Sequence, residues 1–130
     1  MSRMLVPSTS PYAISFGFSR AVRVGDHISV GGTAPIDASG NTVGVGDPAV
    51  QARQCFETIR MALGQAGASL DDVVRTRILL TRIADWKRVA AVRGEYFRSI
   101  RPVDTVMEVS GFIDSDWLIE VEVEAIIDRN

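Results

Sequence analysis

The chain has 130 residues, 46% of them hydrophobic and 23% charged, which fits a single domain spanning 1–130 with a core of its own. Its formal net charge of −2 gives no general attraction to a phosphate backbone, so no nucleic-acid partner is expected. The sequence contains no signal-peptide pattern and no apolar run long enough to cross a bilayer. We therefore expect a soluble, cytoplasmic protein with no membrane partner.

Cysteine and histidine usage argues against a metal site. Cys55 is the single cysteine and His27 the single histidine, so neither an internal disulfide nor a Cys/His group with metal-ligand spacing can form. Cys55 lies on the apolar stripe of a predicted helix, and we interpret it as a small core residue and not a nucleophile. His27 borders a predicted turn and is interpreted as a surface residue.

The first third of the chain predicts strands and loops. Residues 1–13 are polar and interrupted by prolines, which indicates a flexible arm or a short edge strand. Two β-branched runs between residues 20 and 32 flank a Gly-Asp turn and predict a hairpin. The pair Gly31 and Gly32 predicts a bulge or a close backbone approach, with a plain strand end as the alternative. Residues 34–46 read as a loop.

The rest of the chain alternates between helical and strand periodicity. The predicted elements are a helix at 48–66, a strand at 73–81, a helix at 86–100, a strand at 105–109 and a strand at 117–127. Asp47 is suited to cap the first helix, and Pro102 to stop the second. The second helix is expected to bury Trp86, and the strand at 73–81 to direct Val74 toward the core together with Thr76.

This order predicts an α+β fold in which both helices cover one face of a sheet. The other face would carry charges from two strands: Arg75, Arg77, Glu120, Glu122 and Glu124. Opposite charges on neighbouring strands stabilise their pairing by about 0.2–1 kcal/mol each. Such a face is either solvated or, with apolar residues interleaved, a subunit interface.

Five segments together carry a recognisable pattern. They are GFSRAVRVGD at 17–26, QARQ at 51–54, AGASLDDVV at 66–74, Arg101-Pro102 with VMEV at 106–109, and IEVEVEA at 119–125. Through them the chain resembles the RidA/YjgF family of reactive-intermediate deaminases, also called endoribonuclease L-PSP. The resemblance implies a chorismate-mutase-like sheet backed by two helices, a homotrimer, and small-molecule clefts between subunits. It also implies hydrolysis of imines and enamines to 2-keto acids and ammonia without a cofactor.

The family's cleft residues are mostly replaced in this sequence. The carboxylate-binding arginine falls on Asp104, the tyrosine on Phe18, the serine on Gly31 and the asparagine on Ala90, whereas the catalytic glutamate is kept as Glu122. A lost charge-assisted contact costs about 1.5–3 kcal/mol, and an anion in its place adds repulsion of about 1–4 kcal/mol. The usual 2-imino acid activity is therefore not expected.

Three interpretations follow. The chain is an enzyme acting on a neutral or cationic imine or enamine, with Glu122 activating water and Asp104 holding a cation, or it is a non-catalytic trimeric ligand-binding or regulatory protein. The alternative to a catalytic role for Glu122 is that it merely pairs with Arg75 or Arg77. RNA cleavage, suggested by the family's older name, is disfavoured because no histidine or lysine constellation supports it.

Three further residues are candidates for the cleft. Arg101 is one replacement for the missing arginine and Arg77 another, although Arg101 is equally suited to the carboxyl end of the preceding helix. Gly32 adjoins the serine position. Glu108 is expected at the subunit interface or beside the pocket.

Overall fold

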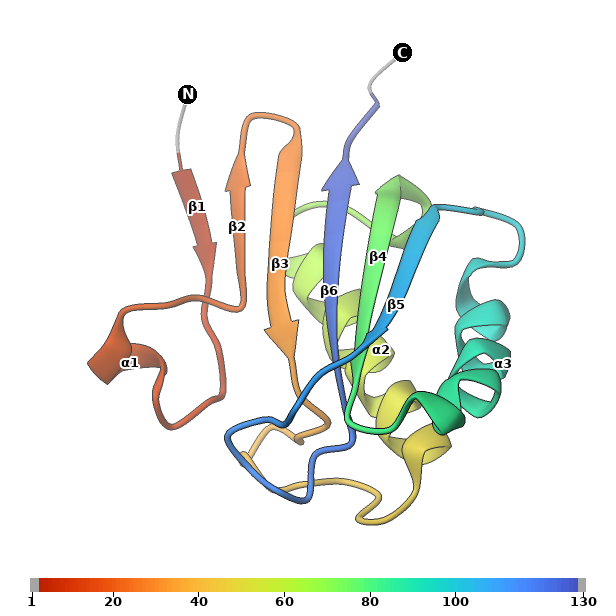
Figure 1. Cartoon of the computed structure of the whole chain (residues 1–130). Helices are drawn as coiled ribbons and strands as arrows, with labels where there is room; N and C mark the ends of the chain where they lie inside the picture. Colours follow the sequence, from red (N-terminus) through yellow and green to blue (C-terminus); the bar gives the residue numbers. More distant parts are fainter. Residues whose placement is uncertain (1–2, 129–130) are drawn as a thin grey trace.

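The computed structural model describes residues 3–128 and has a six-stranded sheet with two long helices on one face (Figure 1). In chain order the elements are β1 (Arg3–Val6), α1 (Ala13–Phe16), β2 (Ala21–Val24), β3 (His27–Thr33), α2 (Pro48–Gln65), the 3₁₀ turn η1 (Leu70–Asp72), β4 (Val73–Leu80), the 3₁₀ turn η2 (Ile83–Asp85), α3 (Trp86–Phe97), β5 (Val103–Glu108) and β6 (Ile119–Ile126). The predicted α+β class is confirmed.

The strand order is β1-β2-β3-β6-β4-β5. All neighbours are antiparallel except β4 and β5, which are parallel. Parallel strands require a crossover, and α3 supplies it. The last strand of the chain therefore lies in the middle of the sheet, with β1 at one edge and β5 at the other (Figure 1).

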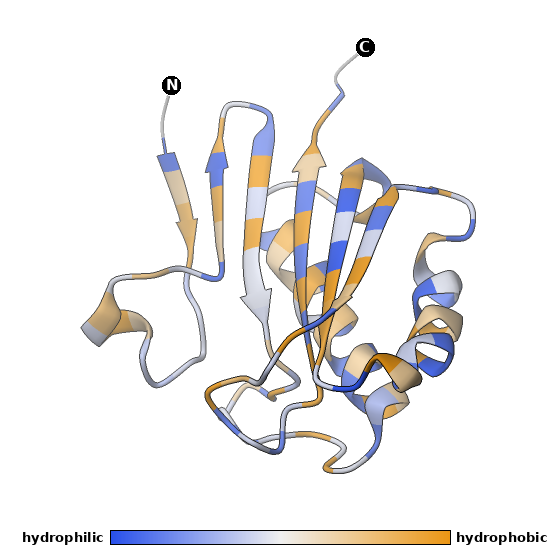
Figure 2. Ribbon diagram, viewed as in Figure 1, coloured by the Kyte–Doolittle hydropathy of each residue, from blue (hydrophilic) through white to orange (hydrophobic). Residues whose placement is uncertain are grey.

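The sequence explains where α2 begins and which of its sides contacts the sheet. The Asp47 side chain accepts hydrogen bonds from the backbone N–H groups of Ala49 and Val50, which satisfies donors that have no partner within the helix. Its apolar stripe buries Phe56, which contacts the ring of Phe97 from α3 at 5.8 Å between centroids. Figure 2 shows the matching alternation of apolar and polar residues along the central strands.

Two side chains face opposite to their predicted direction. Val74 is 42% exposed because the register of β4 against β6 shifts between Val73 and Arg75, and this irregularity turns Val73 inward instead. Trp86, at the first position of α3, is 47% exposed instead of buried. Val92 of the same helix is buried in the core. Helix α3 ends at Phe97 and β5 begins at Val103, so the helix is shorter and the strand starts earlier than predicted.

The N-terminal segment is paired with the sheet. Residues Arg3–Val6 form β1 and run antiparallel to β2, and Val6 is 2% exposed. Strand β3 then bends at Gly31 and Gly32, which lie between the paired residues Val30 and Thr33, where the register against β6 shifts. The glycine bulge, one of the predicted alternatives, is therefore present, and it lies beside the first residues of β6.

Candidate functional site

A cleft of about 260 Å³ opens between the N-terminal segment, β3 and the start of β6. Its lining combines aromatic and apolar side chains with two charged residues, Arg20 and Glu120. Phe18 and Trp117 line it as well, and the Trp117 indole Nε1 is held by donating to Thr42 Oγ1 at 3.0 Å. Mostly apolar walls with a few polar groups are typical of a site for a small organic molecule.

Arg20 is the buried cation of this cleft, with 6% of its surface exposed. Its Nη1 donates to the Gly32 carbonyl at 3.3 Å and to Thr33 Oγ1 at 3.4 Å, and its Nη2 donates to Ser8 Oγ at 3.2 Å. Burial lowers the pKa of Arg20. The guanidinium therefore ties the N-terminal segment to the β3 bulge and sets a fixed positive charge under the cleft.

The bulge makes room for Glu120. A Cβ at Gly32 would lie 2.6 Å from Glu120 Oε1, closer than any ordinary contact, so a larger residue would displace the carboxylate. Burial raises the pKa of Glu120, and the charge of Glu122 raises it further, while Arg20 opposes both. Within residues 3–128, the Glu120 carboxylate makes no hydrogen bond or ion pair of the kind that holds its two neighbours on β6.

The carboxylates of both neighbours, Glu122 and Glu124, have side-chain partners. Arg77 Nη1 donates to Glu122 Oε1 at 2.6 Å. Glu124 accepts from Ser29 Oγ at 2.9 Å and lies 2.6 Å from His27 Nε2. The three glutamates point to the same face because strand residues two apart share a face, but their environments differ. Glu122, the residue assigned by resemblance, is an ion-pair partner, whereas Glu120 is directed into the cleft.

Asp104 is occupied by partners within its own subunit. Thr76 Oγ1 donates to Asp104 Oδ1 at 2.8 Å, and Arg93 Nε lies 3.5 Å from the same oxygen. Arg93 also donates to Thr76 Oγ1 at 2.9 Å and to the Pro102 carbonyl at 3.1 Å. The negative charge expected to hold a cationic ligand is therefore compensated by a neighbouring guanidinium. Sequence reasoning missed Arg93, although it interrupts the apolar stripe of α3.

The predicted site residues divide between the two edges of the sheet. Phe18 and Gly32 line the cleft. Gly31, whose N–H donates to the Arg20 carbonyl at 2.9 Å, lies in the bulge. Ala90, exposed on α3, and Asp104 belong to the β5 edge, separated from the cleft by the intervening strands. One subunit therefore does not bring the two sets together.

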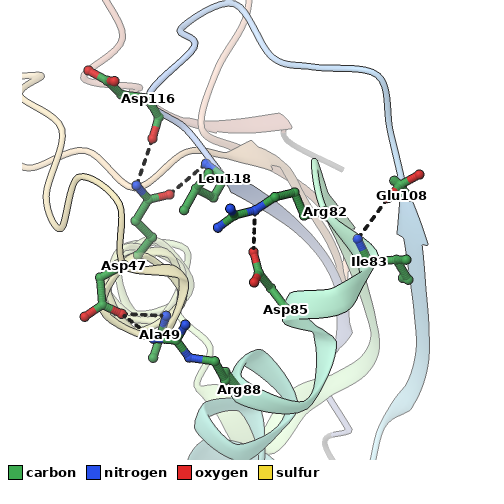
Figure 3. Close-up of polar contacts among 10 residues, drawn as sticks. Asp47, Ala49, Arg82, Ile83, Asp85, Arg88, Glu108, Asp116 and Leu118 are labelled. Carbon is green, nitrogen blue, oxygen red and sulfur yellow. Dashed lines mark hydrogen bonds and ion pairs between the residues drawn. The ribbon is translucent and has the colours of Figure 1, made fainter.

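Two further candidates also lie at the β5 edge. Glu108 Oε1 accepts from the Ile83 N–H at 2.9 Å and so caps η2, as Figure 3 shows. Arg101 has an exposed side chain and a left-handed backbone with φ of 60°. Its N–H donates to the Phe97 carbonyl at 2.8 Å, which closes the end of α3 through the backbone.

Other chemistries find little support in the described residues. Cys55 is 0% exposed and burial raises its pKa, which agrees with a core role. Within residues 3–128 no group of three or more His, Cys, Asp or Glu side chains is arranged to hold a metal ion. Over the same residues, the helices are too short or too polar to cross a membrane.

The fold and the cleft define a small α+β protein with a partly apolar site for an organic molecule at one edge of its sheet. The family model described as Endoribonuclease L-PSP matches residues 8–127. The chain therefore belongs to this family, which includes the RidA/YjgF proteins.

Solved and curated relatives agree with this membership. A Mycobacterium tuberculosis structure, described as a member of the YjgF/YER057c/UK114 family, matches with a TM-score of 0.88 and 42% identity, covering 97% of this chain and 100% of that chain. An uncharacterized Streptomyces coelicolor protein is 42% identical over 92% of this chain and 89% of its own length. The 3-aminoacrylate deaminase RutC of Acinetobacter baylyi is 36% identical over 88% of this chain and 86% of its own.

Proposed function

We propose that the chain hydrolyses an imine or enamine that carries no carboxylate, releasing a carbonyl compound and ammonia. The observation that carries the proposal is the cleft, where the Glu120 carboxylate makes no hydrogen bond with the described residues and lies in the field of the buried Arg20. A carboxyl group free to exchange protons with a bound molecule is what hydrolysis of a C=N bond requires. The RutC relative is described as acting on 3-aminoacrylate, which is itself an enamine.

The expected preference for an uncharged substrate follows from the paired charges at the β5 edge. We place this edge of one subunit beside the cleft of the next in a homotrimer, as the family resemblance implies. Asp104 and Arg93 then contribute a compensated pair, and Arg93 already bonds to Thr76 and the Pro102 carbonyl. Such a pair neither grips a carboxylate nor attracts a cation strongly, because its net charge is zero.

The test is an assay of ammonia release at neutral pH. Suitable substrates are freshly generated 2-aminoacrylate, which is anionic, and 4-aminopent-3-en-2-one, a neutral enamine that yields pentane-2,4-dione. We expect kcat/KM for the neutral enamine to exceed that for 2-aminoacrylate by at least about tenfold, a difference of about 1.4 kcal/mol. A clear preference for 2-aminoacrylate would refute the proposed selectivity, and no turnover of either substrate would refute the activity.

One observation favours a second function, that of a non-catalytic ligand-binding protein. Glu122, at the family's catalytic position, pairs with Arg77 at 2.6 Å, a contact that a purely structural role also explains. If neither substrate is turned over, this function predicts that 4-aminopent-3-en-2-one still raises the Tm of the protein in a thermal-shift assay. An unchanged Tm at millimolar ligand would count against it.

A further inference from the structure

We infer that Glu120, and not Glu122, is the residue that transfers protons to and from the substrate in this chain. The inference rests on the proposed function and deepens it by assigning the acid–base group. Three observations carry it: the engagement of the other glutamates on β6, the access of Glu120 to the cleft, and the space left by Gly32.

The first observation concerns availability. A general base must have a lone pair that the substrate or its attacking water can reach. Arg77 Nη1 donates to Glu122 Oε1 at 2.6 Å, so one of the two Glu122 oxygens already has a charged partner. Glu124 is bound by Ser29 and His27 on the same face. Glu120 has no such contact among residues 3–128.

The second observation concerns access. Glu120 lines the cleft together with Phe18 and Trp117, so a planar C=C–N or C=N group between the aromatic side chains would lie beside its carboxyl. Partial burial favours the neutral, proton-bearing form of Glu120, whereas the nearby guanidinium of Arg20 favours the carboxylate. These opposed effects suit a group that must both give and take a proton.

The third observation is that residue 32 is a glycine. Gly32 is absent from the positive-φ residues of the described chain, so its backbone conformation does not require glycine. What a side chain there would meet is Glu120 Oε1, at 2.6 Å from the Cβ position. The lack of a side chain at residue 32 therefore serves the placement of the Glu120 carboxyl.

The reaction balances with water as the single co-reactant. Protonated Glu120 gives its proton to the β-carbon of an enamine, which becomes an iminium ion. The oxygen of a water molecule attacks the iminium carbon and gives a proton to the Glu120 carboxylate. Glu120 then gives this proton to the nitrogen, and the C–N bond breaks to release ammonia. The hydroxyl proton returns to Glu120 as the carbonyl group forms, with no electrons exchanged with another reagent.

The inference is tested by comparing Glu120→Gln, Glu122→Gln and Glu124→Gln in the full-length protein, with 4-aminopent-3-en-2-one as substrate. We expect kcat to fall by about 100-fold or more in E120Q, the usual contribution of a general acid–base, and by clearly less in the other two. Gly32→Ala keeps every charge but displaces the carboxyl, and we expect a loss of at least about tenfold. Circular dichroism and Tm identify any variant that has failed to fold.

The outcomes separate the two proposals. An active wild-type protein in which E120Q retains its activity, or in which E122Q loses more than E120Q, overturns the assignment of Glu120 but leaves the hydrolytic function standing. A wild-type protein inactive on both 2-aminoacrylate and 4-aminopent-3-en-2-one overturns both. The pH dependence of kcat supplies a further readout, because the limb that Glu120 contributes should disappear in E120Q if its role is chemical.

Discussion

The charges at the β5 edge are arranged differently from the family pattern. The resemblance puts an arginine at residue 104, and this chain has an aspartate there with a guanidinium on the neighbouring helix instead. Thr76, which is fully buried, bonds to both partners. The three side chains form a connected polar group in which Arg93 compensates the charge of Asp104.

This arrangement predicts the behaviour of a charge swap. Asp104→Arg alone would bring two guanidinium groups together and break the bond to Thr76, at a cost of about 1–3 kcal/mol in the free energy of unfolding. Adding Arg93→Asp should restore at least half of that loss, measured by urea unfolding at pH 7. The swapped pair again has no net charge, so the double variant should turn over 2-aminoacrylate no faster than wild type.

Two outcomes would contradict this prediction. If the double variant is no more stable than Asp104→Arg, residues 93 and 104 are not coupled as the ion pair implies. If the double variant turns over 2-aminoacrylate at least about tenfold faster than wild type, a difference of about 1.4 kcal/mol, the net charge of the pair does not decide substrate choice.

Glu120 predicts a pH-dependent effect on stability. Burial raises its pKa above the ordinary 4.5, so the folded state holds the proton more tightly than the unfolded state. The resulting contribution to stability is complete below pH 4.5 and is lost as the pH rises through the folded-state value. Glu120→Gln removes a partly desolvated anion, and we expect its Tm to exceed that of wild type at pH 8, with the difference vanishing near pH 4.

Glu124→Gln is the matched control for this measurement. Its carboxylate accepts a hydrogen bond from Ser29 and contacts His27, so its replacement should lower the Tm at pH 8. A Tm for E120Q at or below that of wild type at pH 8 would show that the Glu120 carboxylate is not under a desolvation penalty.

Single residues were the part of the site that sequence reasoning predicted least well. Strand alternation placed Glu122 on the charged sheet face with Arg75 or Arg77 as its possible partner. The structure selects Arg77, a choice that depends on strand pairing across the sheet and that the sequence left open. The same limit hid Arg93 and Glu120, because the sequence does not state that α3 faces Asp104 or that the β3 bulge opens beside β6. The bulge was one of the alternatives that the two adjacent glycines left open, beside a close backbone approach and a plain strand end, and the register shift between Val30 and Thr33 selects it.

At the scale of elements, most of the helices and strands followed from periodicity and punctuation. Asp47 and the apolar stripe were sufficient to predict α2, and strict alternation was sufficient to predict β6. The errors arose where tertiary contacts override local pattern. Val74 turned outward because β4 has an irregularity against β6, and β5 starts at Val103 because its parallel pairing with β4 begins there.

The side chain of Gln51 on α2, which is fully buried, connects this helix to the segment before β6. Its Nε2 donates to the carbonyls of Asp116 and Gly44 at 2.8 and 3.2 Å, and its Oε1 accepts from the Leu118 N–H at 2.8 Å. Figure 3 shows the two bonds that join α2 to residues 116 and 118, just before β6. These contacts fix the start of the strand that carries Glu120.

We expect Gln51→Ala to leave these partly buried backbone groups without their protein partner and to cost about 2–3 kcal/mol in the free energy of unfolding. For a chain of this size the loss corresponds to a Tm lower by roughly 10 °C. The matched control is Gln65→Ala on the exposed side of the same helix, which should change stability by less than about 0.5 kcal/mol. Equal effects of the two substitutions would show that the buried amide does not anchor β6.

At the scale of the whole molecule, the face of the sheet opposite the helices is unusual for a solvated surface. Arg77 and Glu122 form an ion pair on it. Val103 and Met107 of β5 are 57% and 40% exposed, and their strand positions place them on this same face, since Asp104 between them turns toward Thr76 and α3. Mixed ionic and apolar character is typical of a surface that another subunit covers.

We predict that this face forms the centre of a homotrimer, with a mass in light scattering three times the 14.1 kDa of the chain at a concentration of about 10 µM. Met107→Asp would put an unpaired charge into the buried contact, a penalty large enough to dissociate a standard interface, and should give monomers. Met61→Asp, at a 61% exposed site on α2, carries the same change away from this face and should remain trimeric. Monomeric wild type would refute the assembly, and with it the completion of the cleft by a second subunit; trimeric Met107→Asp would move the interface elsewhere on the molecule.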